Sequence, residues 1–337
     1  MQNQQFKIAI IGLGCISETH IAAIQNNHLG TITAICDVNP QKLKKTEVVV
    51  PYAKQYTDYT ILLEETDANV IHICTPHYLH AAMTLAALAK GKDVYLEKPA
   101  AMTYQEGKII VDAAKKANRK VCVSFQNRLT NANKAAKDIV DSGELGKIIG
   151  LKGIVTWHRE GAYYTDSGWR GTWEKEGGGV LMNQSIHTLD LLHYFGGPIQ
   201  RTCGSVSLRK NSGTIEVEDT AEATIWFESG ATAIFYATNC HVVDSPVEVE
   251  LICENGVLTI RDDILYKRMD GVLIPVTENN KLSIGKSCWG DGHRDMISNF
   301  YEAIRGNGNY YCGIEDGIEV LKIIHDIYET SKEKLGR

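Results

Sequence analysis

The sequence predicts an α/β protein of two domains: an N-terminal parallel sheet covered by helices, and a C-terminal α/β domain with an open, mostly antiparallel sheet. Up to residue 125, short apolar runs alternate with segments of helical periodicity, which indicates a parallel sheet buried on both faces. After that point, strand-like runs follow one another with hairpin turns between them. A chain of 337 residues is long enough for two domains, which we place at 1–125 and 126–337.

In the first domain, short apolar runs alternate with helical patterns. Continuous apolar runs bounded by turn residues predict the strands Lys7–Ile11, Thr31–Cys36, Val70–Cys74, Asp93–Leu96 and Val121–Ser124. Apolar residues at helical spacing predict the helices Ser17–Asn26, Gln41–Val49, Tyr59–Glu65, His77–Ala89 and Thr103–Asn118.

In the second domain, the sequence predicts a different order of elements. Its expected strands are Lys147–Thr156, Cys203–Leu208, Ala221–Phe227, Ala231–Thr238, Val247–Cys253 and Val257–Arg261. Its expected helices are Asn131–Ser142, Val180–Phe195, His293–Arg305 and Glu315–Lys334. The turn signals Glu228-Ser229-Gly230 and Glu254-Asn255-Gly256 predict hairpins, so we expect neighbouring strands to be antiparallel.

Composition excludes several classes of function. The net charge is −6 and no basic run exceeds two lysines, which argues against nucleic acid as the main ligand. No apolar stretch approaches the roughly 20 residues of a membrane helix, and the N-terminus carries no secretory signal. The nine cysteines are scattered without a Cys-x-x-Cys pair, which predicts a reduced, cytoplasmic protein. No Cys/His spacing fits a structural zinc site, so we expect no metal.

A glycine turn follows the first predicted strand. Gly12 allows a tight turn from strand to helix, and Gly14 lets the backbone approach a pyrophosphate at the helix N-terminus. Cys15 and Ile16 follow the turn, and Ser17 stands where a third glycine is usual and can cap the predicted helix. The turn therefore predicts a dinucleotide site that includes Gly12, Gly14, Cys15 and Ile16.

An acidic residue ends the next predicted strand. Asp37 lies 23 residues beyond Gly14, close to the expected spacing of about 20 residues. A carboxylate there accepts hydrogen bonds from a ribose and repels a 2′-phosphate, so we expect NAD rather than NADP. The alternative is that Asp37 only begins a turn with Asn39 and Pro40.

Two further strand ends should face the same crevice, outside the carboxyl ends of the parallel strands. Thr75 and Pro76 follow one strand and are expected at the nucleotide, together with His80, which has an equally good interpretation as a helix-start residue. Glu97 and Lys98 follow the next strand. Partial burial would bring the pKa of a lysine down from about 10.4 toward the range of a base that exchanges a proton with a substrate hydroxyl. The alternative is an ordinary surface lysine.

The segment Gly177–Asp190 supplies a second polar group. On the predicted helix, Asn183, His187 and Asp190 are spaced i, i+4 and i+7 and should share one face. His187 is a suitable general acid or base, and the alternative is a core histidine with satisfied hydrogen bonds.

The loop from Trp157 to Trp173 is rich in aromatic residues and arginine. Arg159 and Tyr163 are candidate contacts to a polyol or sugar, because aromatic faces and hydrogen-bonding groups suit such ligands. A subunit interface explains the same composition nearly as well.

Together these residues resemble the glucose-fructose oxidoreductase / inositol dehydrogenase (Gfo/Idh/MocA) family over essentially the whole chain. The resemblance rests on the order and spacing of several short motifs: Gly12-Leu13-Gly14, Thr75-Pro76, Glu97-Lys98-Pro99, Phe125-Gln126-Asn127-Arg128, Trp169-Arg170-Gly171-Thr172-Trp173, the segment 177–190, Gly292-His293 and Glu315-Asp316-Gly317.

The resemblance implies a Rossmann domain and a C-terminal domain whose open sheet makes homodimers or homotetramers. It implies that Lys98, often followed by a cis proline, and His187 are catalytic, and that Gln126, Trp169 and Arg170 contact the nicotinamide end. Arg128 is a weaker candidate for a substrate contact. The chain departs from inositol dehydrogenase-like members at Asn183, where those carry an aspartate.

We therefore expect a cytoplasmic NAD-dependent dehydrogenase that acts on a sugar, inositol or nucleotide sugar, with Lys98 and His187 as acid and base and Asn183 fixing their geometry. Two rivals remain open. One is a glycosidase that uses tightly held NAD for transient oxidation and elimination. The other is a non-catalytic, dinucleotide-binding sensor.

Overall fold

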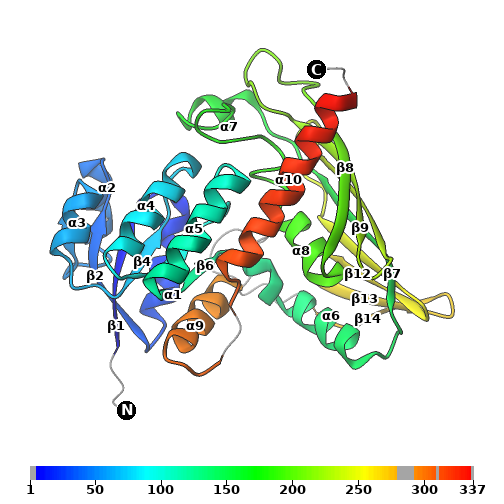
Figure 1. The fold of residues 1–337 in the computed structure, drawn as a ribbon, viewed down its shortest axis with the longest axis horizontal. Helices are drawn as coiled ribbons and strands as arrows, with labels where there is room; N and C mark the ends of the chain where they lie inside the picture. Colours follow the sequence, from blue (N-terminus) through cyan, green and yellow to red (C-terminus); the bar gives the residue numbers. More distant parts are fainter. Residues whose placement is uncertain (1–4, 279–291, 309–310, 335–337) are drawn as a thin grey trace. The chain divides into compact units, whose positions relative to one another are not determined.

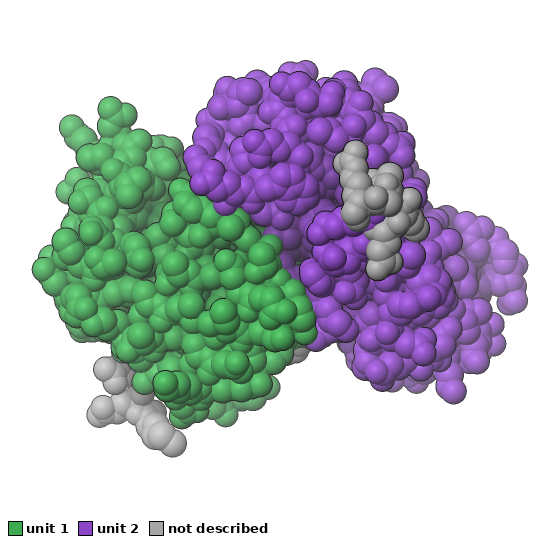
Figure 2. Space-filling view, turned by 45° about the horizontal axis from the view of Figure 1, so that its top comes forward, with its two compact units in different colours: residues 1–126, 291–318 green, residues 127–290, 319–337 purple. Residues whose placement is uncertain are grey.

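The computed structural model describes residues 5–278, 292–308 and 311–334. The chain divides into two units, residues 1–126 with 291–318 and residues 127–290 with 319–337, shown in two colours in Figure 2. The sequence analysis placed everything after residue 125 in the second domain. Residues 291–318 belong instead to the first unit, so the chain returns to it near its C-terminal end.

The sheet of the first unit has six strands in the order β3-β2-β1-β4-β5-β6, and every pair of neighbours is parallel. The strands are β1 (Phe6–Ile11), β2 (Gly30–Cys36), β3 (Lys54–Tyr56), β4 (Val70–Ile73), β5 (Asp93–Leu96) and β6 (Val121–Val123). The direction of winding reverses between β1 and β4, the point at which open α/β sheets bind ligands outside the carboxyl ends of their strands. This confirms the predicted parallel sheet.

Helices cover both faces of that sheet (Figure 1). They are α1 (Cys15–Gln25), α2 (Pro40–Glu47), α3 (Tyr59–Glu65), α4 (His77–Ala89), α5 (Tyr104–Ala117) and α9 (Gly292–Ile304). Polar side chains begin three of them: Asn39 caps α2, Asp58 caps α3, and Thr103 forms a capping box with Glu106 at α5. Helix α9 packs on α1, so a segment far along the chain completes the layer beside the glycine turn.

The second unit contains an eight-stranded sheet in the order β14-β13-β12-β11-β7-β10-β9-β8. Its strands are β7 (Ile148–Thr156), β8 (Ile199–Ser207), β9 (Thr220–Phe227), β10 (Thr232–Thr238), β11 (Glu248–Cys253), β12 (Gly256–Arg261), β13 (Ile264–Met269) and β14 (Val272–Pro275). Strand β7 lies between two runs of hairpins and pairs parallel with β10 and antiparallel with β11. The sheet is therefore mostly antiparallel, as predicted.

The two faces of this sheet differ in burial. On β10, Ala233, Phe235 and Ala237 are buried, whereas the alternating Ile234 is 62% exposed. Helix α8 (Ile186–Gly196) packs against the face that β7 and β10 bury. The unit also contains the 3-10 turn η1 (Gln126–Leu129), α6 (Asn131–Ser142), α7 (Gly161–Thr165) and most of α10 (Ile314–Lys334). On the opposite face, Ile234 is exposed among the residues that the structure describes.

One predicted helix is too long. The sequence analysis began it at Val180, but α8 begins at Ile186, and residues 180–185 form turns. Val180, Leu181 and Met182 are buried because the backbone of this segment bonds to Glu218: Gly179 and Leu181 donate their N–H groups to its carboxylate at 3.0 Å each. A buried apolar turn and a buried helix give the same hydrophobic pattern.

Among the residues that the structure describes, no helix is long and apolar enough to cross a membrane.

Candidate active site

The glycine turn between β1 and α1 has little room on one side and open space on the other. Gly12 has φ +91°, and a Cβ there would lie 2.7 Å from the backbone of Cys74 at the end of β4. A Cβ on Gly14 would meet no atom within 4 Å. Gly12 is therefore required by the fold, whereas Gly14 keeps the N-terminus of α1 open, as a pyrophosphate site requires. Cys15, the first residue of α1, is exposed there.

Asp37 lies directly beside this turn. Its Oδ2 accepts a hydrogen bond from the N–H of Leu13 at 2.8 Å, and its Oδ1 accepts one from the N–H of Asn39 at 2.8 Å. The Lys42 ammonium lies 3.4 Å from Oδ2. The carboxylate thus joins the end of β2 to the glycine turn. The contact with Asn39 also fits the alternative interpretation, in which Asp37 begins a local turn. The same buried carboxylate therefore fits both the ribose-binding and the local-turn interpretation.

The strand ends of β4 and β5 are tied together by His80, on α4. Its Nδ1 lies 2.7 Å from the carbonyl oxygen of Pro99 and its Nε2 lies 2.8 Å from that of Thr75. Burial lowers the pKa of His80, although both contacts raise it. The Thr75 methyl lies 2.9 Å from the position of a Cβ on Gly12, so the chain after β4 packs directly against the glycine turn.

Lys98 follows β5 and is half-buried, and its peptide bond to Pro99 is cis. The backbone on its N-terminal side is held by the sheet, because the N–H of Glu97 donates to the carbonyl of Ile73 at 3.0 Å. On its C-terminal side, His80 holds the Pro99 carbonyl. The lysine therefore projects from a turn that is fixed at both ends.

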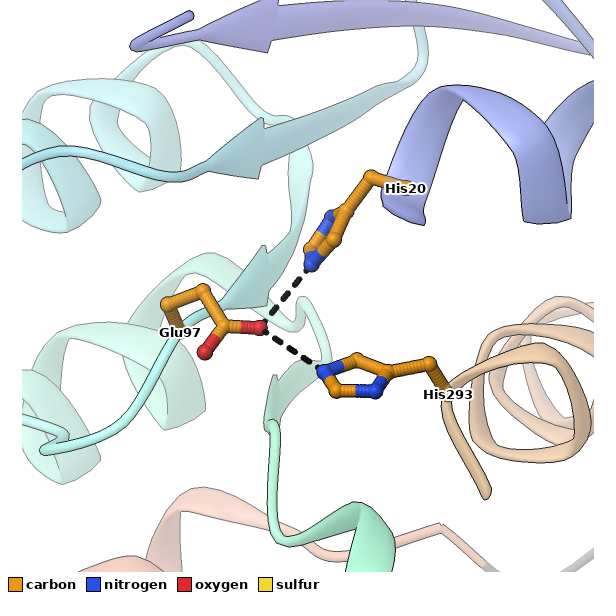
Figure 3. A group of neighbouring side chains, drawn as sticks. All are labelled: His20, Glu97 and His293. Carbon is orange, nitrogen blue, oxygen red and sulfur yellow. Dashed lines mark hydrogen bonds and ion pairs between the residues drawn. The ribbon is translucent and has the colours of Figure 1, made fainter. Parts of the chain in front are cut away.

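At Glu97, the residue before Lys98, two buried histidines converge on one carboxylate oxygen (Figure 3). Glu97 Oε1 lies 2.9 Å from His20 Nε2 and 3.5 Å from His293 Nε2. His20 comes from α1, and His293 comes from the start of α9. Burial raises the pKa of Glu97, but its contacts with the two histidines outweigh burial and hold that pKa well below the usual value.

These three side chains are also of types that bind divalent metal ions, and their ligand atoms lie within 4.8 Å of one another. The 2.9 Å between His20 and Glu97 is a hydrogen-bond distance, and both histidines contact the same oxygen. We therefore interpret the cluster as a hydrogen-bonded acid–base group.

The sequence analysis missed His20, His72 and His293. A signal was present, because His72 interrupts the continuous apolar run Val70–Ile73, and a polar group in a buried strand needs a partner. The partners themselves come from residues 52 and 229 positions away, which no local pattern connects.

In the second unit, the expected polar stripe on one helix face is wrong. Since α8 begins at Ile186, Asn183 precedes the helix and cannot share a helical face with His187 and Asp190. The Asn183 amide instead donates to Glu176 Oε1 at 2.6 Å and to the Tyr163 hydroxyl at 3.3 Å. His187 is half-buried in the first turn of α8.

A hydrogen-bond network surrounds Asn183. Gln184 donates to the Tyr163 hydroxyl at 3.0 Å, and Asn239 donates to Gln184 Oε1 at 2.9 Å. Glu176 also accepts from the N–H of Gly171 at 2.6 Å, which ties the aromatic loop to the segment before α8. Tyr163 and Asn183, predicted from sequence, thus lie together, while Gln184, Glu176 and Asn239 were missed.

The predicted arginines occupy different surroundings. Arg128 is 1% exposed and binds Asp190 through Nε and Nη2, at 2.9 and 2.6 Å. This buried pair favours a structural role for Arg128 over a substrate contact. Arg159 binds Asp244 at 2.9 Å and lies over the ring of Trp157.

Arg170 stacks over the rings of Tyr163 and Trp169, with centroid distances of 4.5 and 4.8 Å. Its buried Nε has no hydrogen-bond partner among the described residues. The same is true of Gln126 Oε1, in a side chain that is 2% exposed in the first unit.

A parallel sheet wound in this order, an open glycine turn, a buried acid after β2 and a held lysine after β5 define a dinucleotide-binding protein. Comparison with protein families identifies its kind. Residues 6–125 match the model "Oxidoreductase family, NAD-binding Rossmann fold", and residues 133–259 match "GFO/IDH/MocA C-terminal domain". The chain belongs to the Gfo/Idh/MocA family of NAD-binding oxidoreductases.

Individual relatives extend over nearly the whole chain. Levoglucosan dehydrogenase of Pseudarthrobacter phenanthrenivorans is 23% identical over 98% of this chain and 97% of its own length. D-glucoside 3-dehydrogenase of Escherichia coli is 27% identical, with 98% and 97% covered. The WlbA dehydrogenase of Bordetella pertussis, crystallised with NADH and UDP-GlcNAcA, has a TM-score of 0.84 at 26% identity, and 98% of each chain is covered.

Proposed function

We propose that this protein is an NAD-dependent dehydrogenase that transfers a hydride between nicotinamide and a carbinol carbon of a sugar, inositol or nucleotide sugar. The observation that carries the proposal is the half-buried Lys98, held at the carboxyl end of β5 in the unit that bears the open glycine turn and Asp37. A base at the strand ends where a dinucleotide binds suits removal of a hydroxyl proton during hydride transfer. The named relatives oxidise sugars or bind a nucleotide sugar with NADH, which supports this substrate class.

In this proposal each unit supplies part of the chemistry. Lys98 and His187 take the hydroxyl proton, and Asn183 orients the substrate or His187 through its fixed amide. Because Asn183 is neutral, it cannot stabilise a charged His187 electrostatically, so proton transfer falls mainly to Lys98.

The remaining assignments concern ligand contacts. Tyr163 and Arg159 are proposed substrate contacts. The proposed NAD contacts are Gly12, Gly14, Cys15, Ile16, Asp37, Thr75, Pro76, His80, Glu97, Lys98, Gln126, Trp169 and Arg170. Of these, Gln126 and Arg170 each present a buried polar atom that no described residue satisfies. When NAD is bound it supplies the hydride acceptor, and the chain supplies binding, orientation and the proton acceptor.

A panel of inositols, sugars, sugar acids and nucleotide sugars tests the proposal, with NADH absorbance as the readout. Lys98→Ala is run beside Lys116→Ala, a lysine on the exposed side of α5. We expect turnover of one substrate class that falls by about 100-fold or more in Lys98→Ala and stays unchanged in the control. Turnover that survives in Lys98→Ala would contradict the assignment.

The two rivals give different results in the same assay. A glycosidase working by transient oxidation consumes substrate and releases its substituent without net formation of free NADH. A sensor binds NAD with no turnover, and its biological activity survives Lys98→Ala. Neither rival has an observation in this structure that favours it over the dehydrogenase.

We also propose that a second copy of the chain covers the exposed face of the eight-stranded sheet. Ile234, on the inner strand β10 of that face, is 62% exposed. Exposed aliphatic residues on a central strand are typical of interfaces. Ile234→Arg should shift the mass measured by light scattering toward the monomer, whereas an unchanged mass would rule out this face.

Finally, we propose that the protein works in the cytoplasm. All eight cysteines that the structure describes are free thiols, which suits a reducing compartment. Measured thiols after purification under air, compared with reduced samples, test whether any of them pair.

A further inference from the structure

Four buried side chains of the first unit form one continuous line of contacts that ends at Glu97. The Tyr301 hydroxyl lies 2.8 Å from His72 Nε2, and His72 Nδ1 lies 2.9 Å from His20 Nδ1. His20 Nε2 then lies 2.9 Å from Glu97 Oε1. The four residues come from α9, β4, α1 and the end of β5, so the line crosses the unit from its last helix to the turn that carries Lys98.

Each contact in this line joins two atoms that must share one proton. If Glu97 is a carboxylate, His20 Nε2 must donate to it, which leaves His20 Nδ1 as an acceptor when the ring is neutral. His72 Nδ1 must then donate to His20, and its Nε2 must accept from the Tyr301 hydroxyl. Every ring nitrogen is satisfied, both imidazoles are neutral, and all the donors point toward Glu97.

A second contact to His20 Nδ1 fits this direction. The Cys74 Sγ lies 3.4 Å from His20 Nδ1. Burial, with a further contribution from the Glu97 charge, raises the pKa of Cys74 well above its usual value, so the sulfur stays a thiol and can donate weakly. With His20 Nδ1 unprotonated, as the carboxylate form of Glu97 requires, this thiol has an acceptor for its proton.

The ionisation behaviour of the rings agrees with neutral imidazoles. Burial lowers the pKa of His20, partly opposed by its hydrogen bond to Glu97. Burial and the neighbouring His20 hold the pKa of His72 well below its usual value. Burial also raises the pKa of Tyr301 well above its usual value, so the hydroxyl at the far end keeps its proton.

The reverse direction is the competing state. If Glu97 takes up a proton, it donates to His20 Nε2, His20 Nδ1 donates to His72, and His72 Nε2 donates to the Tyr301 oxygen. The Tyr301 proton then needs another acceptor in a fully buried site. Protonation of Glu97 therefore inverts both histidine tautomers at once, and the tautomers report the charge of Glu97.

We propose that Tyr301, His72 and His20 form a one-directional hydrogen-bond relay that holds Glu97 as a buried carboxylate and thereby fixes the position of Lys98. These are positioning residues: they act through Glu97, whose backbone is hydrogen-bonded to β4 and whose next residue is Lys98. The titratable groups that face the relay are His293 on Glu97, Cys74 on His20, and Tyr95, which stacks on His72 at 4.9 Å.

The relay also connects the two functional ends of the first unit. His20 lies on α1, the helix whose open N-terminus is the proposed pyrophosphate site, and Glu97 immediately precedes Lys98. A shift of α1 toward or away from a bound dinucleotide would therefore be transmitted to the base through a single side-chain contact. This part of the inference rests on the proposed function, whereas the direction of the relay does not.

Nitrogen NMR of the histidine rings in the full-length protein tests the direction without any substrate. Assignments come from His20→Gln and His72→Gln variants. We expect a neutral His20 protonated on Nε2 and a neutral His72 protonated on Nδ1, with no change between about pH 6 and 8. The opposite tautomers, a charged ring at either position, or a metal ion bound to His20 Nε2 would each overturn the relay.

Kinetics test the positioning role with two matched variants. Tyr301→Phe removes the hydroxyl that begins the relay, while Tyr95→Phe removes an equally buried hydroxyl that contacts Ser124 at 3.3 Å outside it. We expect Tyr301→Phe to lower kcat by about 10-fold with little change in the KM for NAD, and Tyr95→Phe to leave both nearly unchanged.

An equal loss of kcat in the two variants would contradict the positioning role, because it would show that the Tyr301 hydroxyl contributes no more than any buried hydroxyl. If no substrate turns over in any variant while the tautomers are as expected, the proposed function fails and the relay stands. If turnover is normal and the tautomers are reversed, the relay fails and the proposed function stands.

Discussion

Asp37 Oδ2 accepts a hydrogen bond from the backbone N–H of Leu13 at 2.8 Å, so the acid that ends β2 is fixed directly against the glycine turn. The side chain is only 8% exposed, and its remaining neighbours are the N–H of Asn39 and the Lys42 ammonium. In the proposed NAD site, this carboxylate would accept a hydrogen bond from a ribose hydroxyl and would repel a phosphate at the same place.

Replacing Asp37 should therefore change the choice of cofactor. Asp37→Ser removes the repulsion and leaves Lys42 to attract a 2′-phosphate. We expect the ratio of kcat/KM for NAD to that for NADP to fall by about 100-fold. Steady-state kinetics with both cofactors measure this, and an unchanged ratio would show that Asp37 serves only the local turn.

A substitution at Gly14 should weaken cofactor binding without affecting folding. A Cβ there meets no atom within 4 Å and the backbone has an ordinary φ of −82°, so Gly14→Val should leave thermal stability nearly unchanged. The added side chain would occupy the space at the start of α1, and NAD affinity should fall by at least about tenfold in calorimetry. Gly213→Ala, also in open space but far along the chain, is the control for affinity. Normal NAD binding by Gly14→Val would remove the pyrophosphate site from this turn.

The buried ion pair of Arg128 and Asp190 should contribute to the free energy of unfolding. Asp190→Asn leaves a guanidinium that is 1% exposed without its counter-charge, and we expect a loss of about 3–5 kcal/mol in the free energy of unfolding. Asp138→Asn, on the exposed side of α6, should change it by less than about 0.5 kcal/mol. The double variant Arg128→Met with Asp190→Asn should recover part of the loss in urea unfolding. No recovery would mean that the pair is not the source of the cost.

Glu218 makes stability depend on pH. Burial raises the pKa of Glu218 to about 7, although its hydrogen bonds from Leu181 and Gly179 lower it. In the unfolded chain the pKa of this carboxyl is 4.5, so the folded protein keeps the proton to a higher pH than the unfolded chain does. The contribution of Glu218 to stability is therefore complete below about pH 4.5 and is lost as the pH rises to about 7.

The shift corresponds to about 3 kcal/mol between those limits. Glu218→Gln keeps an acceptor for both N–H groups and cannot ionise. Relative to the natural protein, this variant should therefore gain stability as the pH rises from about 5 to 8. Chemical unfolding across that range measures the difference, and a difference that is constant with pH would show that Glu218 does not titrate there.

The sequence predicts most of the fold because its elements are long and regularly patterned. Strand β13 (Ile264–Met269) was missed, although it lies inside the sheet. Two other strands were missed for a physical reason: β3 (Lys54–Tyr56) has only one buried residue, and β14 (Val272–Pro275) is exposed throughout. Both strands lie at sheet edges, where burial no longer marks a strand. The segment before α8 shows the opposite error, in which buried residues outside a helix were predicted to be helical. Val180 and Leu181 are buried by their contacts with Glu218.

The residues of the candidate site also fall into those that the sequence predicts and those that it misses. Gly12, Gly14, Asp37, Thr75 and Lys98 were found because strand–turn–helix spacing marks the carboxyl ends of parallel strands. The relay was not found, because the 229 positions between His72 and Tyr301 are bridged only by the return of the chain to the first unit. Long-range polar pairs of this kind leave at most a trace in the sequence, namely a histidine within an apolar strand.

The most direct test of the central claim follows the hydride itself. A substrate found in the panel is labelled with deuterium at its carbinol carbon and turned over by the natural protein and by Lys98→Ala. We predict that deuterium appears in free NADH, one per substrate oxidised, and that the rate falls by about 100-fold or more in the variant. Deuterium that returns to the product, with no labelled NADH, would contradict net dehydrogenation and indicate transient oxidation instead.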